Sequence, residues 1–193
     1  MNNLQFVPKW LITSAILTAF TIFLHEIAHY VSAVGFGAEN VKLHWLDVSF
    51  DEGSLNRTGA AVTALAGPFS TYMIIIVVWL SGANGLVPLA LGIGAASRNL
   101  VLLPFAIKTV LGHDISSFSN DEVRTAMILN VSPLPFGLIA AILGVGGIII
   151  FLRRAFHAKG VLFPISLIIG TVLGIMLWSV IGPMLMSGGR GFA

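Results

Sequence analysis

Residues 10–34 read WLITSAILTAFTIFLHEIAHYVSAV, an almost unbroken apolar run that contains the pattern H-E-x-x-H at His25, Glu26 and His29. A helix needs about 20 residues to cross a bilayer, so this run is long enough. An ionisable side chain near the centre of such a helix costs about 3 kcal/mol on insertion scales. Two histidines and a glutamate in this setting therefore indicate a function.

The spacing of the pattern predicts a metal site. Residues four apart lie on the same helix face with Cβ atoms about 5–6 Å apart, so His25 and His29 can bind one zinc ion. Glu26 can then reach a water molecule on that metal. Two other interpretations are a chance motif and a signal peptide that begins at Lys9 and is cleaved after residues 31–33. The apolar setting disfavours the first, and the multi-span remainder of the chain disfavours the second.

The composition predicts an integral, multi-pass protein of the cell membrane. Of the 193 residues, 56 % are hydrophobic and only 9 % are charged, with a mean hydropathy of +0.96. A soluble domain carries about 25 % charged residues. The net charge of +2 and the lack of a basic aromatic patch exclude nucleic acid as a partner. The chain has no cysteine, so a metal must be held by histidine, carboxylate or amide side chains.

We expect one all-α membrane-embedded domain over residues 1–193. It should contain about five transmembrane helices, and a short β-hairpin should follow the first. Residues 41–50 are rich in β-forming residues and are followed by a turn at 51–54. They are about equally compatible with a hairpin and with an ordinary surface loop. If it forms, its free edge could pair with an extended peptide. The expected spans are residues 10–34, 58–80, 86–107, 134–152 and 161–185.

A third metal ligand is expected from residues 111–122, which hold three of the eight acidic residues. Asp114 follows a broken helix and stands in a loop, from which a side chain can reach a metal. Asp121 has another explanation, because an acid in the first turn after the N-cap Asn120 stabilises a helix. Asp114 is therefore the expected ligand, with Asp121 and His113 as alternatives.

A polar residue in the third expected span, Asn99, is a further candidate for the site. Asparagine is costly in an apolar run, so it either lines a site or hydrogen-bonds a neighbouring helix. With the other motifs it makes the first two-thirds of the chain resemble the site-2 protease family of intramembrane zinc metalloproteases, as a minimal or divergent member. The resemblance is carried by His25-Glu26-Ile27-Ala28-His29, Ala66-Gly67-Pro68, Asn99, Pro104 and Asp114.

The resemblance implies hydrolysis of a peptide bond in or near a transmembrane helix of a membrane-protein substrate. Zn²⁺ would be held by His25, His29 and Asp114, and would activate a water molecule. Glu26 would take the proton of that water, and Asn99 would hydrogen-bond the oxyanion. The lipid bilayer and the substrate helix are then the partners, while the oligomeric state is left open.

Two other functions use the same histidine pair. One is a membrane metal-ion carrier, which would favour further acids or histidines along a path through successive spans. The other is a catalytically inactive scaffold that binds a partner helix. Almost no acids or histidines occur in the expected spans after the first, and the sequence keeps Glu26, so the protease is the favoured hypothesis.

Overall fold

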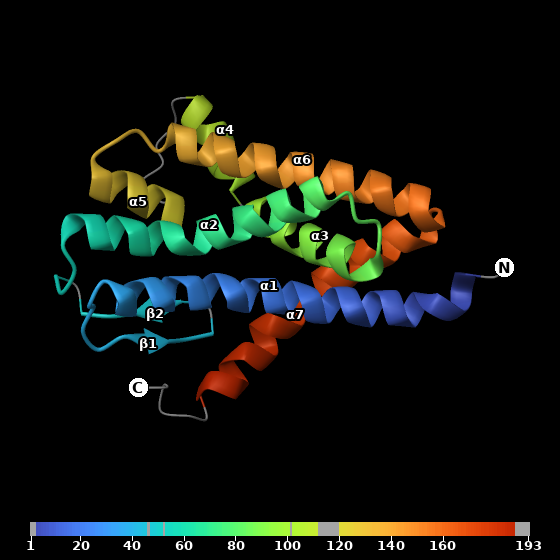
Figure 1. Cartoon of the computed structure of the whole chain (residues 1–193), viewed down its shortest axis with the longest axis horizontal. Helices are drawn as coiled ribbons and strands as arrows, with labels where there is room; N and C mark the ends of the chain where they lie inside the picture. Colours follow the sequence, from blue (N-terminus) through green and yellow to red (C-terminus); the bar gives the residue numbers. More distant parts are fainter. Residues whose placement is uncertain (1–2, 46, 52, 101, 112–119, 188–193) are drawn as a thin grey trace.

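The structure is a computed structural model that describes residues 3–45, 47–51, 53–100, 102–111 and 120–187 (Figure 1). Within these residues, four helices are long and apolar enough to cross a membrane: α1 (Val7–Gly35), α2 (Arg57–Ser81), α6 (Leu134–Lys159) and α7 (Leu162–Ser187). Three shorter helices accompany them: α3 (Leu86–Leu100), α4 (Leu103–Val110) and α5 (Asp121–Leu129). A 3₁₀ turn, Asn3–Phe6, precedes α1.

The expectation of about five transmembrane helices is wrong at the third expected span. Residues 86–107 do not form a single helix. Helix α3 ends at Leu100, and the amide of Leu102 bonds to the carbonyl of Asn99. Pro104 then lies in the first turn of α4, where its missing N–H removes no helical hydrogen bond. The 15 residues of α3 are fewer than the roughly 20 that a full crossing needs.

The segment between residue 121 and the next span is not one continuous helix. Helix α5 ends at Leu129, and Asn130 adopts the left-handed conformation with φ 57° and ψ 47°. Helix α6 begins afresh at Leu134 after Pro133, and it continues to Lys159 rather than ending at residue 152.

The hairpin after the first span is present, as expected. Strand β1 (Lys42–Leu43) pairs antiparallel with β2 (Val48–Ser49), with Lys42 opposite Ser49 and Leu43 opposite Val48. The hairpin lies beside the C-terminal half of α1, at the end of the molecule that also holds α5 (Figure 1).

Helix α1 is the central element and packs against α2, α3 and α7. Its buried face is polar, with residues three or four apart turned inward, and an apolar membrane helix hides polar groups in this way. The approach of α7 is close, since a Cβ atom added at Gly170 would lie 2.6 Å from the carbonyl oxygen of Leu11. The buried polar residues of α1 are Ser14, Thr18, Thr21, His25, Glu26 and His29.

The two ends of the bundle differ in their interior. At the N-terminal end of α1 the core is apolar, with Trp10, Leu89, Phe151 and Phe163 almost fully buried. Polar groups are buried at the other end, where α1, α2, α3 and α5 meet. The apolar packing that stabilises the fold is thus concentrated at the end of the bundle away from the polar site. This apolar end supports the polar site.

Candidate metal centre

Three side chains converge between α1 and α5. His25 and His29 are 2 % and 7 % exposed, and their Nε2 atoms lie 3.0 Å apart. Oδ2 of Asp121 lies 3.0 Å from Nε2 of His25 and 3.2 Å from Nε2 of His29. Among the described residues, this group of two imidazoles and one carboxylate has the donor atoms and proximity to hold a metal ion.

Asp121 reaches the histidines because of where α5 begins. Asn120 caps the helix, its Oδ1 accepting the amide of Val123 at 2.8 Å, so Asp121 is the first helical residue. The next residue, Glu122, accepts a 2.8 Å hydrogen bond from the hydroxyl of Tyr72 on α2. The sequence-based explanation of Asp121 as a first-turn acid is therefore correct, yet the same side chain also points at the histidines.

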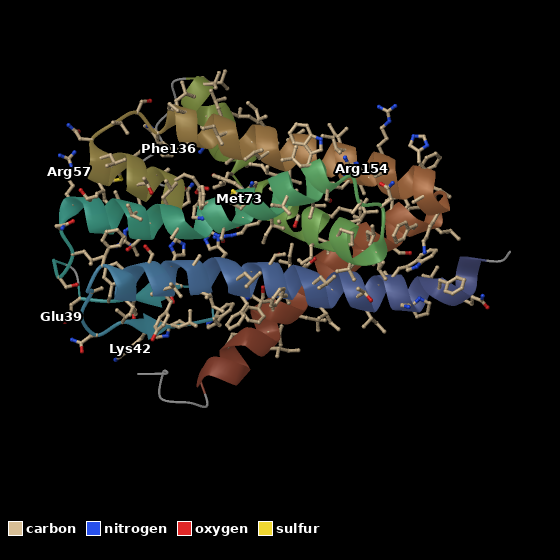
Figure 2. All side chains as sticks on the ribbon, viewed as in Figure 1. Glu39, Lys42, Arg57, Met73, Phe136 and Arg154 are labelled. Atoms are coloured by element: carbon tan, nitrogen blue, oxygen red, sulfur yellow. The ribbon has the colours of Figure 1, made fainter. Side chains whose placement is uncertain are left out.

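The far end of α5 is anchored as well. Arg57 donates from Nε to the carbonyl of Ile128 at 2.7 Å and from Nη2 to the carbonyl of Leu129 at 2.5 Å. Figure 2 shows Arg57 at the start of α2, beside α5. A nine-residue helix is marginal alone, so these bonds and its packing on α2 stabilise α5 where Asp121 can act.

Both histidines present an unprotonated Nε2 to the centre in their neutral form. Nδ1 of His29 donates to the carbonyl of Thr63 at 2.6 Å, which fixes its proton there. Nδ1 of His25 lies 3.1 Å from the hydroxyl of Thr71, which itself donates to the carbonyl of Gly67 and so accepts from the imidazole. Metal-ligating histidines are oriented in the same way by a partner on the second nitrogen.

The residues fit a zinc ion on two observations. Two imidazole nitrogens and a carboxylate oxygen face one another at 3.0–3.2 Å, an arrangement that a cation, either a proton or a metal ion, stabilises. Ligand atoms at about 2.0–2.1 Å from a tetrahedral zinc lie roughly 3.3 Å apart, close to these distances. Gly67 also leaves room here, because a Cβ atom at this position would overlap Nε2 of both histidines.

Two cavities meet at the centre. Cavity A, of about 310 Å³, extends between α1, α3 and α7, and cavity B, of about 260 Å³, extends towards β2. Glu26, Arg98, Asn120 and Asp121 line both and form the wall that they share. Glu26 is 4 % exposed and lines both cavities, together with His25 in cavity A and with His29 in cavity B.

Asn99 lines cavity A from the end of α3. It is 2 % exposed, and its Nδ2 has no hydrogen-bond partner among the residues that the structure describes. Gly144 of α6 holds it in place, since a Cβ atom there would lie 2.8 Å from Cβ of Asn99. A buried amide donor without a partner is costly, which is typical of a group that serves a ligand.

The packing around α5 shifts the pKa values of its two acidic side chains, Asp121 and Glu122. Burial raises the pKa of the Asp121 carboxyl group, but hydrogen bonds from the imidazoles of His25 and His29, when these carry a proton on Nε2, outweigh burial and hold that pKa below its usual range. Arg98 adds a positive charge, with Nη2 at 3.5 Å from Oδ2 of Asp121. Burial raises the pKa of Glu122, which the Tyr72 hydroxyl opposes in part. Asp121 is thus a charged carboxylate, as a metal ligand must be.

The structure brings together His25, Glu26, His29 and Asn99, as the sequence indicates, and adds Asp121 from the alternatives. Asp114 and His113 lie outside the described residues. Sequence reasoning missed Thr63 and Thr71, the residues that orient the histidines. Both lie four residues from Gly67 and so share its helix face. Arg98, whose charge in an apolar run is compatible with an interior site or with a side chain that extends to the membrane surface, lies beside Asp121.

Comparison with known proteins returned no matching family model, no similar curated protein and no similar solved structure.

Proposed function

We propose that this protein is an intramembrane zinc metalloprotease, with His25, His29 and Asp121 as the ligands. The observation that carries the proposal is the convergence of these three ligand atoms beside Glu26, within helices apolar enough to span a membrane. The H-E-x-x-H pattern on one helix combines two ligands with a general base in metalloproteases. Asp121 replaces Asp114 as the proposed third ligand because its oxygen already meets both imidazoles.

Each side chain has a defined role in hydrolysis. Zinc, when bound, would act as a Lewis acid that polarises the substrate carbonyl and lowers the pKa of a water molecule. Glu26 accepts a proton from the attacking water and delivers it to the leaving amine. Asn99 donates its unpartnered Nδ2 hydrogen to the carbonyl oxygen as negative charge develops there. Thr63 and Thr71 keep the imidazoles in the required tautomer.

The proposed substrate is a transmembrane segment of another protein. An intact helix hides its peptide bonds, so such a segment must unwind before a carbonyl can reach Glu26 and Asn99. The β1–β2 hairpin stands beside the site end of α1, and Val48 and Phe50 line cavity B. It is therefore placed to pair with an unwound segment by strand addition.

The decisive experiment compares wild type with Glu26→Gln in proteoliposomes that contain a model transmembrane substrate. Wild type should bind about one zinc per chain and cleave the substrate, whereas the variant should bind zinc without cleaving. Cleavage by the variant would contradict the assigned mechanism. Zinc transfer across the membrane by both proteins, without cleavage, would instead favour the metal-ion carrier.

A further inference from the structure

Cavity A changes character along its length. At the metal centre its wall is polar, formed by His25, Glu26 and Asp121. Farther along, between α1 and α7, the wall is apolar and includes Ile22, Leu102 and Ile175. A few polar groups at one end and apolar surface at the other are usual in a ligand pocket, where the polar groups fix the orientation of the ligand.

Cavity B differs in chemistry. Besides the wall shared with cavity A, it is lined by the charged side chains of Asp47 and Arg124, and also by His29, Thr63, Val48, Phe50, Ala60 and Ala64. Cavity A instead adds the large apolar side chains of Ile22, Leu102 and Ile175. An apolar side chain next to the reacting bond is better accommodated in cavity A, because cavity B would place it near the charges of Asp47 and Arg124.

The size of cavity A is that of a small-ligand pocket. Its volume is about 310 Å³, at the lower end of the range of such pockets. A pocket of this size suits side chains of an extended segment, which agrees with a substrate that has already unwound.

A second observation indicates that a ligand belongs here. The Nδ2 atom of Asn99, in the wall of cavity A, is a buried donor without a partner. A peptide carbonyl held by this donor places the adjoining side chain inside the cavity, with Ile22 and Ile175 among its lining residues. The polar anchor and the apolar interior thus recognise two neighbouring parts of one peptide.

We propose that cavity A is the specificity pocket of the enzyme and selects a large apolar residue, of leucine or phenylalanine size, next to the scissile bond. This inference rests on the proposed function, since it assumes that a peptide reaches the metal centre. It adds the class of residue at which the substrate is cut and two specificity-determining side chains, Ile22 of α1 and Ile175 of α7.

The test uses the zinc-loaded full-length protein in detergent and a series of short peptide hydroxamates. The hydroxamate group binds the metal, and the members differ in one side chain: glycine, alanine, leucine or phenylalanine. Affinities measured by calorimetry should rise by about tenfold or more from the glycine to the leucine member, as expected for burial of a large apolar side chain. Ile22→Phe, which fills the cavity, should remove this preference while zinc per chain stays unchanged.

Ile16→Phe is the matched control, since Ile16 lies on the same helix but is 62 % exposed and does not line the cavity. It should keep the preference of wild type. Equal affinities across the series in wild type, or a preference that survives in Ile22→Phe, would overturn the pocket while the zinc site stands. A wild type that binds no zinc would overturn the proposed function, and the pocket with it.

Discussion

Nε2 of His25 on α1 lies 3.0 Å from Oδ2 of Asp121, a residue 96 positions later in the chain. The contact joins the first long helix to the first turn of α5, a helix of nine residues. It makes the identity of the third ligand a measurable question, because each candidate acid can be neutralised without a change of shape.

Asp121→Asn should therefore lower zinc affinity by at least about 100-fold, since loss of a mere supporting partner already costs 10–100-fold. Zinc per chain, measured by elemental analysis on detergent-purified protein, reports the change. Asp114→Asn is the matched control and should keep the wild-type content. Loss of zinc in Asp114→Asn alone would restore Asp114 as the ligand.

Gly67→Ala should prevent zinc binding while the protein still folds. The added methyl group would overlap Nε2 of both histidines and push the imidazoles apart. Gly146→Ala on α6 is the control, because no heavy atom lies within 4 Å of a Cβ atom there. The same elemental analysis, with thermal unfolding to check folding, should give full zinc content for Gly146→Ala. Full content in Gly67→Ala would place the metal elsewhere.

Tyr72→Phe should weaken zinc binding indirectly, through loss of the hydrogen bond from the Tyr72 hydroxyl to Glu122, the residue after Asp121. The variant leaves the buried Glu122 carboxyl group without its hydrogen-bond donor, which costs about 1–3 kcal/mol and loosens α5 on α2. Competition with a zinc chelator should show a drop of about tenfold or more. Tyr30→Phe changes the other of the two tyrosines and should match wild type. An unchanged affinity in Tyr72→Phe would show that α5 is held by its other contacts.

Thr71→Val should reduce zinc affinity by about 10–100-fold, because Nδ1 of His25 loses its partner and the ring loses its orientation. Thr171→Val is the comparison, since Thr171 also makes a buried hydroxyl contact, with Ser14, but far from the histidines along α1. Both variants should lose a similar amount of thermal stability, and only Thr71→Val should lose zinc affinity. Equal zinc affinities would remove Thr71 from the site.

Asn99→Ala should keep zinc and lose cleavage. Removal of a single donor to a developing oxyanion lowers kcat by about 100–1,000-fold in other hydrolases. The zinc content separates this role from a structural one and should change little, whereas the affinity for a hydroxamate of fixed side chain should fall, because Asn99 holds the peptide carbonyl. If zinc falls together with kcat, Asn99 supports the fold of the site instead.

The sequence predicted those parts of the site that follow from local spacing. His25 and His29 meet because residues four apart share a helix face, and Asn120 caps α5 because its side chain satisfies an orphan amide. The hairpin followed from β-forming residues and a turn.

Tertiary packing decided what the sequence could not. A first-turn acid is stable on its own helix, so the pattern at Asp121 gave no sign of a distant partner, which only the packing of α5 on α2 supplies. The break after Leu100 was missed because residues 100–107 remain apolar and Pro104 is compatible with both a kink and a new start. Arg98 was ambiguous for a similar reason, since its charge suits both a surface and a carboxylate partner.

The break that ends α3 has a consequence for the access of water. Its 15 residues rise by only about 22 Å, whereas the hydrocarbon core of a bilayer is about 30 Å thick. Asn99 lies one residue before the end of α3, so the polar groups around it are placed where this short helix stops, within the thickness that the long helices could span. For the proposed protease, this would shorten the apolar distance that water must cross to reach the metal centre.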